Sequence, residues 1–219
     1  MNQSDLRPAR DFAIQFGAKC VIYGGAGTGK TPLISTAPRP VLLAVEPGLL
    51  SMKSSTVPTW VAPTKARIDE FMKWFEGSAE ARNFDTLAID SVSQMCNIAL
   101  DESTSKHGLA QYGDMADYVM PYLKRLYYTK QKHLYLIAKE ELTSDNKRRP
   151  SFPGRFLPIE IPHLYDGIFR LARVPIPNIG ETLAFQCNPS IDVTARNRTG
   201  TLDDFEPPNF SQLVKKMLA

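Results

Sequence analysis

The sequence predicts an α/β fold in which a mainly parallel central sheet carries helices on both faces. Short apolar runs typical of buried strands alternate along the chain with segments whose apolar residues recur at helical spacing. A glycine-rich turn follows the first of these strands and precedes a predicted helix. Strands that alternate with helices favour right-handed crossovers, and therefore parallel neighbours in one sheet.

The elements of this fold can be placed along the chain in order. Strands are expected at residues 19–23, 41–45, 59–62, 86–90 and 133–138, and helices at 30–36, 64–76, 91–103 and 114–130. After a basic, proline-broken stretch at 146–156, which we expect to lack regular structure, the predicted elements are strands at 167–174, 182–186 and 191–196 and a helix at 209–217.

Length and composition limit the class of protein. A chain of 219 residues can bury one sizeable core, so we expect a single domain over residues 1–219, with an N-terminal segment at 1–17, a core at 18–174 and a C-terminal hairpin and helix at 175–219. The hydrophobic fraction of 43% and the charged fraction of 22% are typical of globular proteins. With 26 basic and 23 acidic residues, net charge says little about a nucleic-acid partner.

The chain shows neither a signal sequence nor a membrane-spanning run of apolar residues, so the expected location is the cytoplasm. Its cysteines, Cys20, Cys96 and Cys187, are far apart in sequence, and we expect buried free thiols and no metal site or disulfide framework.

The glycine-rich turn matches the pattern G-x-x-x-x-G-K-[S/T] at every fixed position. The matching residues are Gly24, Gly25, Ala26, Gly27, Thr28, Gly29, Lys30 and Thr31. Glycines let backbone amides turn inward around phosphate oxygens, and the start of the following helix adds partial positive charge. We therefore expect Lys30 to reach the β- and γ-phosphates and Thr31 to hold Mg²⁺. The alternative is a glycine turn with an exposed lysine.

Two carboxylates follow predicted strands and are expected near this turn. Asp90 ends the strand at 86–90, where a carboxylate can assist a nucleotide-bound magnesium ion; the alternative is a helix N-cap, a part that Ser91 could also play. Glu46 follows the strand at 41–45 and is expected to activate water, unless it is a solvated turn residue. Ligands of parallel sheets bind beyond the carboxyl ends of the strands, so both should face Lys30 and Thr31.

This order of phosphate cradle, strand-end glutamate and strand-end Asp-Ser resembles the RecA-like P-loop NTPase core. The similarity is closest to the phage-encoded RecA-like ATPases, described as AAA-type, of the single-strand annealing and recombination group. It rests also on SFPGRF at 151–156, YDGIFRLARV at 165–174 and VTARNRTGTLDDFEPPN at 193–209. The resemblance implies ATP and Mg²⁺ as cofactors, a C-terminal β-hairpin extension, a homo-oligomeric ring or filament, and catalytic roles for Lys30, Glu46 and Asp90.

Further site residues are implied by position within the resemblance. Arg196 and Arg198 fall where RecA-like proteins have an element that reaches the nucleotide of the neighbouring subunit, and arginine suits the charge of a transferring phosphoryl group. The alternative is a solvated hairpin edge. Lys139 stands where relatives place a glutamine or histidine that senses the γ-phosphate. This departure leaves the sensing step open.

The basic stretch at 146–156 occupies the position of the second DNA-contacting loop of the RecA-like fold. Cations neutralise phosphates and aromatic faces stack on unpaired bases, so the expected ligand is single-stranded DNA bound without regard to sequence. A solvated basic loop is the alternative. The segment 105–113, which includes His107, is a weaker candidate for the first loop. The expected DNA-binding residues are Lys147, Arg148, Arg149, Phe152 and Arg155.

These observations together predict an ATP-hydrolysing, DNA-stimulated enzyme that supports phage DNA annealing or recombination in the host cytoplasm. A single-strand-binding or replication protein is an expected partner. We do not expect the protein to bind a membrane. Two alternatives remain open at this point, since the cradle serves phosphoryl transfer generally. One is a nucleotide or small-molecule kinase, and the other is a nucleotide-gated binding protein of the helicase-loader type.

Overall fold

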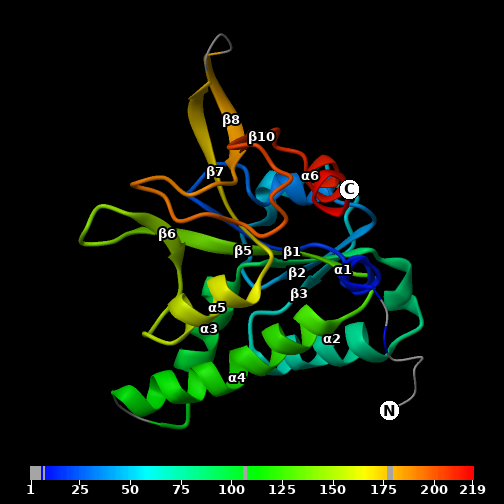
Figure 1. Cartoon of the computed structure of the whole chain (residues 1–219). Helices are drawn as coiled ribbons and strands as arrows, with labels where there is room; N and C mark the ends of the chain where they lie inside the picture. Colours follow the sequence, from blue (N-terminus) through cyan, green and yellow to red (C-terminus); the bar gives the residue numbers. More distant parts are fainter. Residues whose placement is uncertain (1–5, 7, 106–107, 177–179) are drawn as a thin grey trace.

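The computed structural model describes residues 6, 8–105, 108–176 and 180–219. Within these residues the strands form one sheet in the order β10-β8-β7-β1-β5-β4-β2-β3, with β6 added to β5 and β9 added to β7 (Figure 1). The predicted α/β fold with a mainly parallel sheet is therefore confirmed.

The centre of the sheet is parallel. β5 (His133–Leu142) lies between β1 (Lys19–Gly24) and β4 (Thr86–Asp90), and β2 (Pro40–Ala44) and β3 (Thr59–Val61) follow beyond β4. β7 (Gly167–Ile176) pairs in parallel with the other side of β1. The carboxyl ends of β1, β5, β4 and β2 consequently meet at one edge, which positions the candidate site.

The antiparallel strands extend this core. β8 (Gly180–Gln186) pairs antiparallel with β7, so the hairpin includes a strand that was expected to belong to the core, and β10 (Phe205–Glu206) pairs with β8. β6 (Arg148–Ser151) pairs with the end of β5, and β9 (Arg196–Asn197) pairs with the start of β7.

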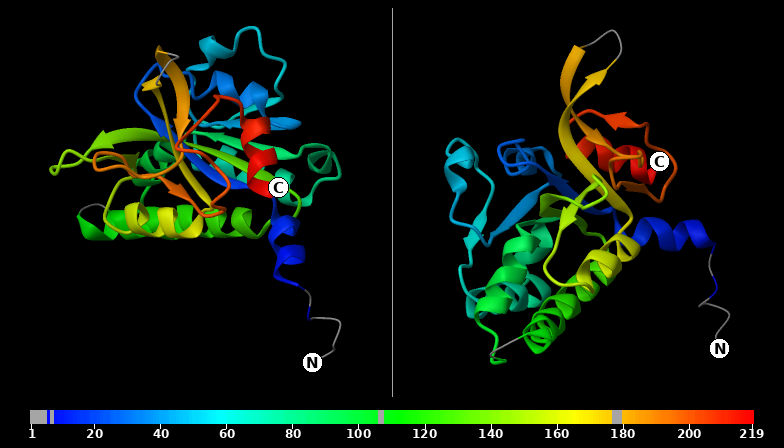
Figure 2. Two further views of the ribbon diagram at one scale, coloured as in Figure 1. Left: turned by 45° about the horizontal axis from the view of Figure 1, so that its top comes forward. Right: turned by 90° about the vertical axis from the view of Figure 1, so that its left-hand side faces the viewer.

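Helices cover both faces of the sheet, because alternate residues of the buried strands are apolar on either side. One face carries α2 (Lys65–Gly77), α3 (Val92–Asp101), α4 (Leu109–Tyr128) and α5 (Leu157–Leu164). The other face carries α6 (Phe210–Leu218) and the 3₁₀ turn η2 (Pro32–Thr36). Two more 3₁₀ turns, η3 (Leu49–Met52) and η4 (Glu80–Asn83), lie in connections. α1 (Ala9–Phe16) projects from the body and buries none of its residues (Figure 2).

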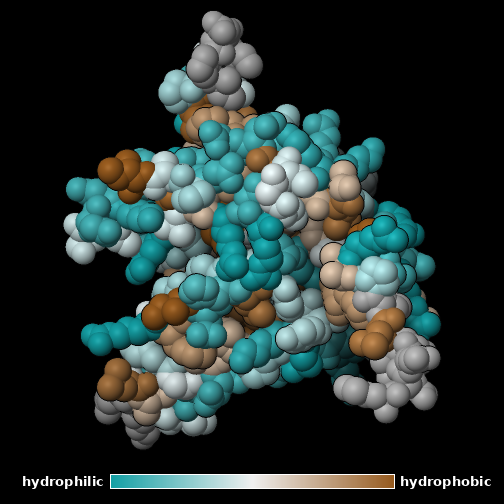
Figure 3. Space-filling view, in the orientation of Figure 1, coloured by the Kyte–Doolittle hydropathy of each residue, from teal (hydrophilic) through white to brown (hydrophobic). Residues whose placement is uncertain are grey.

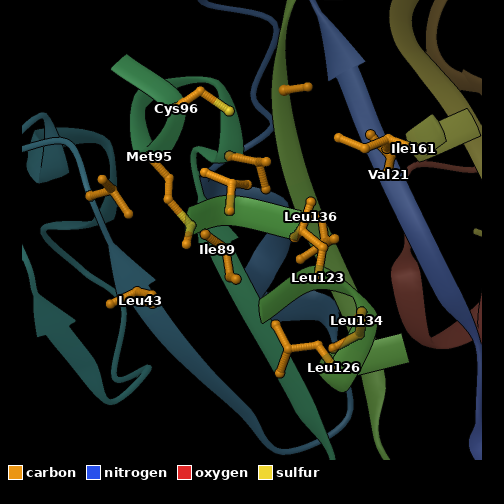
Figure 4. Close-up of a cluster of buried hydrophobic side chains, with 14 of the residues drawn as sticks. Val21, Leu43, Ile89, Met95, Cys96, Leu123, Leu126, Leu134, Leu136 and Ile161 are labelled. Atoms are coloured by element: carbon orange, nitrogen blue, oxygen red, sulfur yellow. The ribbon is translucent and has the colours of Figure 1, made fainter. Parts of the chain in front are cut away.

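The larger core cluster joins the sheet to α3, α4 and α5. Val21 of β1, Ile89 of β4 and Leu136 of β5 meet Met95 of α3 and Leu123 of α4 there (Figure 4). On the opposite face, Ile22 of β1 and Phe210 of α6 belong to a second cluster. The alternation of Val21 and Ile22 between the two clusters is what a strand buried on both sides requires.

Several expectations about elements were wrong. Residues 30–36 form only the 3₁₀ turn η2, α4 begins at Leu109 rather than residue 114, and of the predicted strand at 191–196 only Arg196 lies in a strand. The segment 146–156 is not wholly irregular. Pro150 is accommodated in β6 because that strand pairs with β5 on one side and, within the described residues, forms only a single bridge, from Arg148 to Val193, on the other, so no amide is needed from residue 150. α1 and α5 were not predicted.

None of the helices in the described part of the chain combines the length and the apolar composition that a membrane span requires. Cys20, Cys96 and Cys187 are buried free thiols, as expected.

Candidate functional site

A cavity of about 460 Å³ opens at the carboxyl ends of the central strands. The cradle turn that follows β1 forms one wall, and residues that end or follow β4 and β2, together with residues 137–140 within β5, form the others. The polar side chains that line this cavity include those of Lys30, Thr31, Glu46, Asp90 and Lys139. Residues separated by more than a hundred positions in sequence are thus brought to one site by the parallel sheet.

The cradle has the backbone that its glycines permit. Gly27 and Gly29 have φ of +74° and +93°, a left-handed conformation that side chains with a Cβ rarely adopt. Lys30 Nζ donates hydrogen bonds to the carbonyl oxygens of Gly24 at 2.7 Å and Gly25 at 2.8 Å, so its side chain folds over the turn. Burial lowers the pKa of Lys30, and the charge of Asp90 opposes this shift. A phosphate bound in the cradle would therefore offset the unfavourable free energy of burying the ammonium group.

Thr31 and Asp90 are in direct contact across the cavity floor. Thr31 Oγ1 donates a hydrogen bond of 2.6 Å to Asp90 Oδ2, although β5 separates their strands in the sheet. Burial raises the pKa of Asp90, while the hydrogen bond from Thr31 lowers it. A hydroxyl and a carboxylate oxygen side by side are the hard donors that Mg²⁺ prefers, so these residues fit a nucleotide-bound magnesium ion.

Glu46 lies beside Asp90, because the backbone amide of Val45 donates to the Asp90 carbonyl at 2.7 Å. Its Oε1 accepts a hydrogen bond of 2.7 Å from Ser91 Oγ and lies 3.7 Å from Lys139 Nζ. Ser91 also caps α3 by accepting from the amide of Gln94 at 3.1 Å. The N-cap is therefore Ser91 rather than Asp90, which leaves the aspartate free to face the cavity.

Sequence reasoning missed three residues around Glu46 and Lys139. Ser91 was weighed only as a cap, Gln94 accepts a hydrogen bond of 3.2 Å from Lys139 Nζ, and Glu140 lines the cavity while it accepts one of 2.7 Å from Arg170. The spacing of Ser91 and Gln94 at a predicted helix start could have indicated the first two. Nothing local marks Glu140, whose partner is on β7.

The structure does not bring Arg196 and Arg198 to this cavity. β9 pairs with Gly167 and Ile168 at the start of β7, which is the edge of the sheet opposite the cradle. Arg198 donates to Asp166 Oδ1 at 3.2 Å and to the His163 carbonyl at 2.8 Å, and Arg196 donates to the Pro162 carbonyl. Neither arginine reaches the nucleotide cavity of its own chain.

The expected DNA-binding residues divide into paired and unpaired groups. Arg148 pairs with Asp192 at 3.1 Å, and Arg149 pairs with Glu141 at 2.6 Å. Among the residues that the structure describes, Lys147 and Arg155 have no acidic partner within ion-pair distance. The expectation that Phe152 stacks on bases is wrong, since its side chain is only 4% exposed and belongs to the core of the α2–α5 face.

An aromatic surface does lie nearby. A second cavity of about 590 Å³ separates the start of α4 from the loop 154–156, and Leu109, Tyr112, Arg155 and Phe156 help to line it. Leu109 is 87% and Phe156 50% exposed, and apolar side chains gather over this end of α4 and α5 (Figure 3). The expected first loop, 105–113, is in part the first turn of α4, and His107 lies outside the described residues.

A phosphate cradle between a strand and a helical turn, with Thr31 against a strand-end aspartate, defines a P-loop nucleoside triphosphatase. The chain belongs to the AAA domain family, whose model matches residues 17–173. It is accordingly a P-loop ATPase.

The chain is similar to the KaiC-like protein PH0186 from the hyperthermophilic archaeon Pyrococcus horikoshii OT3, with 14% identity over 81% of this chain and 83% of that chain and a TM-score of 0.47. No curated protein matches the chain.

Proposed function

We propose that the protein is a RecA-like enzyme that hydrolyses ATP, assembles as a homo-oligomer and binds single-stranded DNA. The observation that carries the hydrolytic part is the convergence of Lys30, Thr31, Asp90 and Glu46 on one cavity. Magnesium, when bound, would neutralise phosphate charge beside Thr31 and Asp90.

In this reaction Lys30 binds the β- and γ-phosphates, and Glu46 accepts the proton of a water that attacks the γ-phosphorus. The bond between that phosphorus and the bridging oxygen breaks, and ADP and inorganic phosphate leave. Glu46 lines the cavity beside Asp90, where its carboxylate can polarise a water near the γ-phosphate. A kinase would instead need a pocket for the molecule that accepts the phosphoryl group. No observation on the described residues indicates such a pocket.

The hydrolytic proposal is tested by phosphate release from purified protein. We expect Lys30→Ala to lower turnover on the order of a hundredfold, because charge stabilisation of the transferring group is lost. Lys73→Ala, which changes an exposed lysine of α2, is the matched control and should retain full turnover. Equal turnover in the two variants would contradict the proposal.

Single-stranded DNA is proposed to bind over the cavity at the start of α4. Tyr112 and Phe156 offer aromatic faces there, and Arg155, a cation without an acidic partner, lines the same cavity. Lys147, the second such cation, lies at the turn between β5 and β6. Stacking on unpaired bases and neutralisation of phosphates together give binding that tolerates any sequence. We propose that such binding supports the annealing or recombination of phage DNA, together with a single-strand-binding or replication protein.

Fluorescence anisotropy with a labelled single strand tests the DNA site. Phe156→Ala should weaken binding by roughly fivefold or more, since stacking contributes about 1–3 kcal/mol per base. Tyr128→Ala, an exposed aromatic at the other end of α4, is the control. Equal affinities of the two variants for the strand would contradict DNA binding at this surface. If ATP turnover does not change when single-stranded DNA is added, the proposed stimulation of hydrolysis by DNA is wrong.

The oligomer is proposed because Arg196 and Arg198 face away from their own cavity. A second copy whose cradle edge meets this end of the sheet would receive an arginine beside its γ-phosphate. Lys30→Ala and Arg198→Ala should each lose turnover, and mixing the two variants should restore part of it, because one mixed interface is complete. Absence of recovery, with both variants folded by circular dichroism, would contradict action between copies.

A further inference from the structure

A lysine lies against the carboxylate that is proposed to activate water. Lys139 Nζ is 3.7 Å from Glu46 Oε1, the same oxygen that accepts the hydrogen bond from Ser91. The side chains of Lys139 and Glu46 are 50% and 38% exposed, and both line the nucleotide cavity. The pair therefore borders the cavity in which the phosphates are proposed to bind.

The backbone of Lys139 is held firmly although its side chain is half exposed. Its amide donates a hydrogen bond of 2.9 Å to Ser93 Oγ, which in turn donates one of 2.7 Å to the Ser151 carbonyl of β6. The ammonium group has Gln94 as a further neutral acceptor at 3.2 Å. Rotation of the side chain can thus move the charge while the strand stays in place.

This pairing affects both partners. A carboxylate oxygen that already accepts from a hydroxyl and faces an ammonium group is a poorer acceptor for the proton of water. Exposed ion pairs contribute only about 0–1 kcal/mol, so a multiply charged phosphate competes for the lysine effectively. A diphosphate that ends at the cradle offers no such competitor at the position of the third phosphate.

We propose that Lys139 is a positioning residue that exchanges partners, pairing with Glu46 until a γ-phosphate enters and then binding that phosphate. The exchange frees Glu46 to activate water only when a triphosphate is present. This inference rests on the proposed ATP hydrolysis at the same cavity. It also explains how a lysine can serve at a position where a neutral side chain was expected.

Equilibrium binding separates this role from a structural one. Wild type, Lys139→Gln, Glu46→Gln and the double variant are titrated with magnesium and either ADP or a non-hydrolysable ATP analogue. Lys139→Gln should weaken the analogue about tenfold, as for loss of a charge-assisted hydrogen bond, and should change ADP less than about twofold. Lys139→Arg should restore most of the difference. Lys130→Gln, an exposed lysine beyond α4, is the control.

The pairing itself is tested by the second substitution. Glu46→Gln should strengthen binding of the analogue about threefold more in wild type than in the Lys139→Gln background, because it releases the lysine only where the lysine exists. Equal weakening of ADP and analogue, no weakening, or the same effect of Glu46→Gln in both backgrounds would overturn the inference. Wild type that binds the analogue without turning over ATP would refute the proposed function alone, whereas binding of neither nucleotide would refute both.

Discussion

Asp90 is a residue whose charge matters more than its shape. Its carboxylate already holds Thr31, and burial raises its pKa. Asp90→Asn keeps the size of the side chain and a hydrogen-bond acceptor but removes the negative charge, so we expect a loss of turnover on the order of a hundredfold or more. Asp101→Asn, at the exposed end of α3, is the control. If both variants keep wild-type turnover with saturating Mg-ATP, Asp90 has no role at the metal.

The two phenylalanines of the 151–156 segment should behave in opposite ways. Phe152 is 4% exposed and lies in the core, so Phe152→Ala should lower the free energy of unfolding by about 3–5 kcal/mol. Phe156 is 50% exposed, and Phe156→Ala should change that free energy by no more than about 0.5 kcal/mol. Denaturation in urea measures both. A larger loss of unfolding free energy in Phe156→Ala would show that the ring of Phe156 packs against the protein and is not available to bind a ligand.

Two helices begin with a hydroxyl N-cap, but only one of these caps also contacts a residue of the candidate site. Thr64 accepts from the amide of Arg67 at the start of α2, and Ser91 accepts from the amide of Gln94 at the start of α3. Thr64→Ala and Ser91→Ala should each lower the free energy of unfolding by about 1 kcal/mol. Only Ser91→Ala should also alter ATP turnover, because Ser91 alone donates to Glu46. Parallel changes of turnover in both variants would instead indicate a general effect of stability.

The order of the elements could be read from sequence where the pattern is local. Apolar runs predicted β1, β2, β4 and β5, because strands buried on both faces consist mainly of apolar residues. The predicted boundaries failed where a neighbour decides the conformation. β6 exists because β5 continues beyond its apolar run to Leu142 and offers a partner, which no property of residues 148–151 indicates.

A buried lysine connects the sheet to the end of α4, two parts of the molecule that are far apart in sequence. Lys19 Nζ donates to the Thr129 carbonyl at 2.8 Å and the Lys132 carbonyl at 2.7 Å, and burial lowers its pKa to about 7. Between about pH 7 and its ordinary pKa of 10.5, the unfolded chain holds a proton on this lysine that the folded chain has lost. Stability contributed through Lys19 therefore rises with pH in this window.

Comparison of wild type with Lys19→Met isolates this contribution. The free energy of unfolding of wild type, relative to that of the variant, should increase from about pH 7 to about pH 10. Urea denaturation at several pH values gives the difference. A constant difference would mean that the ammonium group keeps its proton throughout the window.

The phosphate cradle and the carboxylates at the strand ends could be predicted from sequence, because these depend on a few adjacent residues and on the rule that parallel strands end together. Which side chains meet depends instead on how distant segments pack. The packing places β5 between β1 and β4 and so sets Lys139 against Glu46. It also buries Phe152, leaves Phe156 exposed and brings Arg198 to the edge opposite the cradle. These outcomes follow from pairing between distant segments, whose register depends on the whole core rather than on any local pattern.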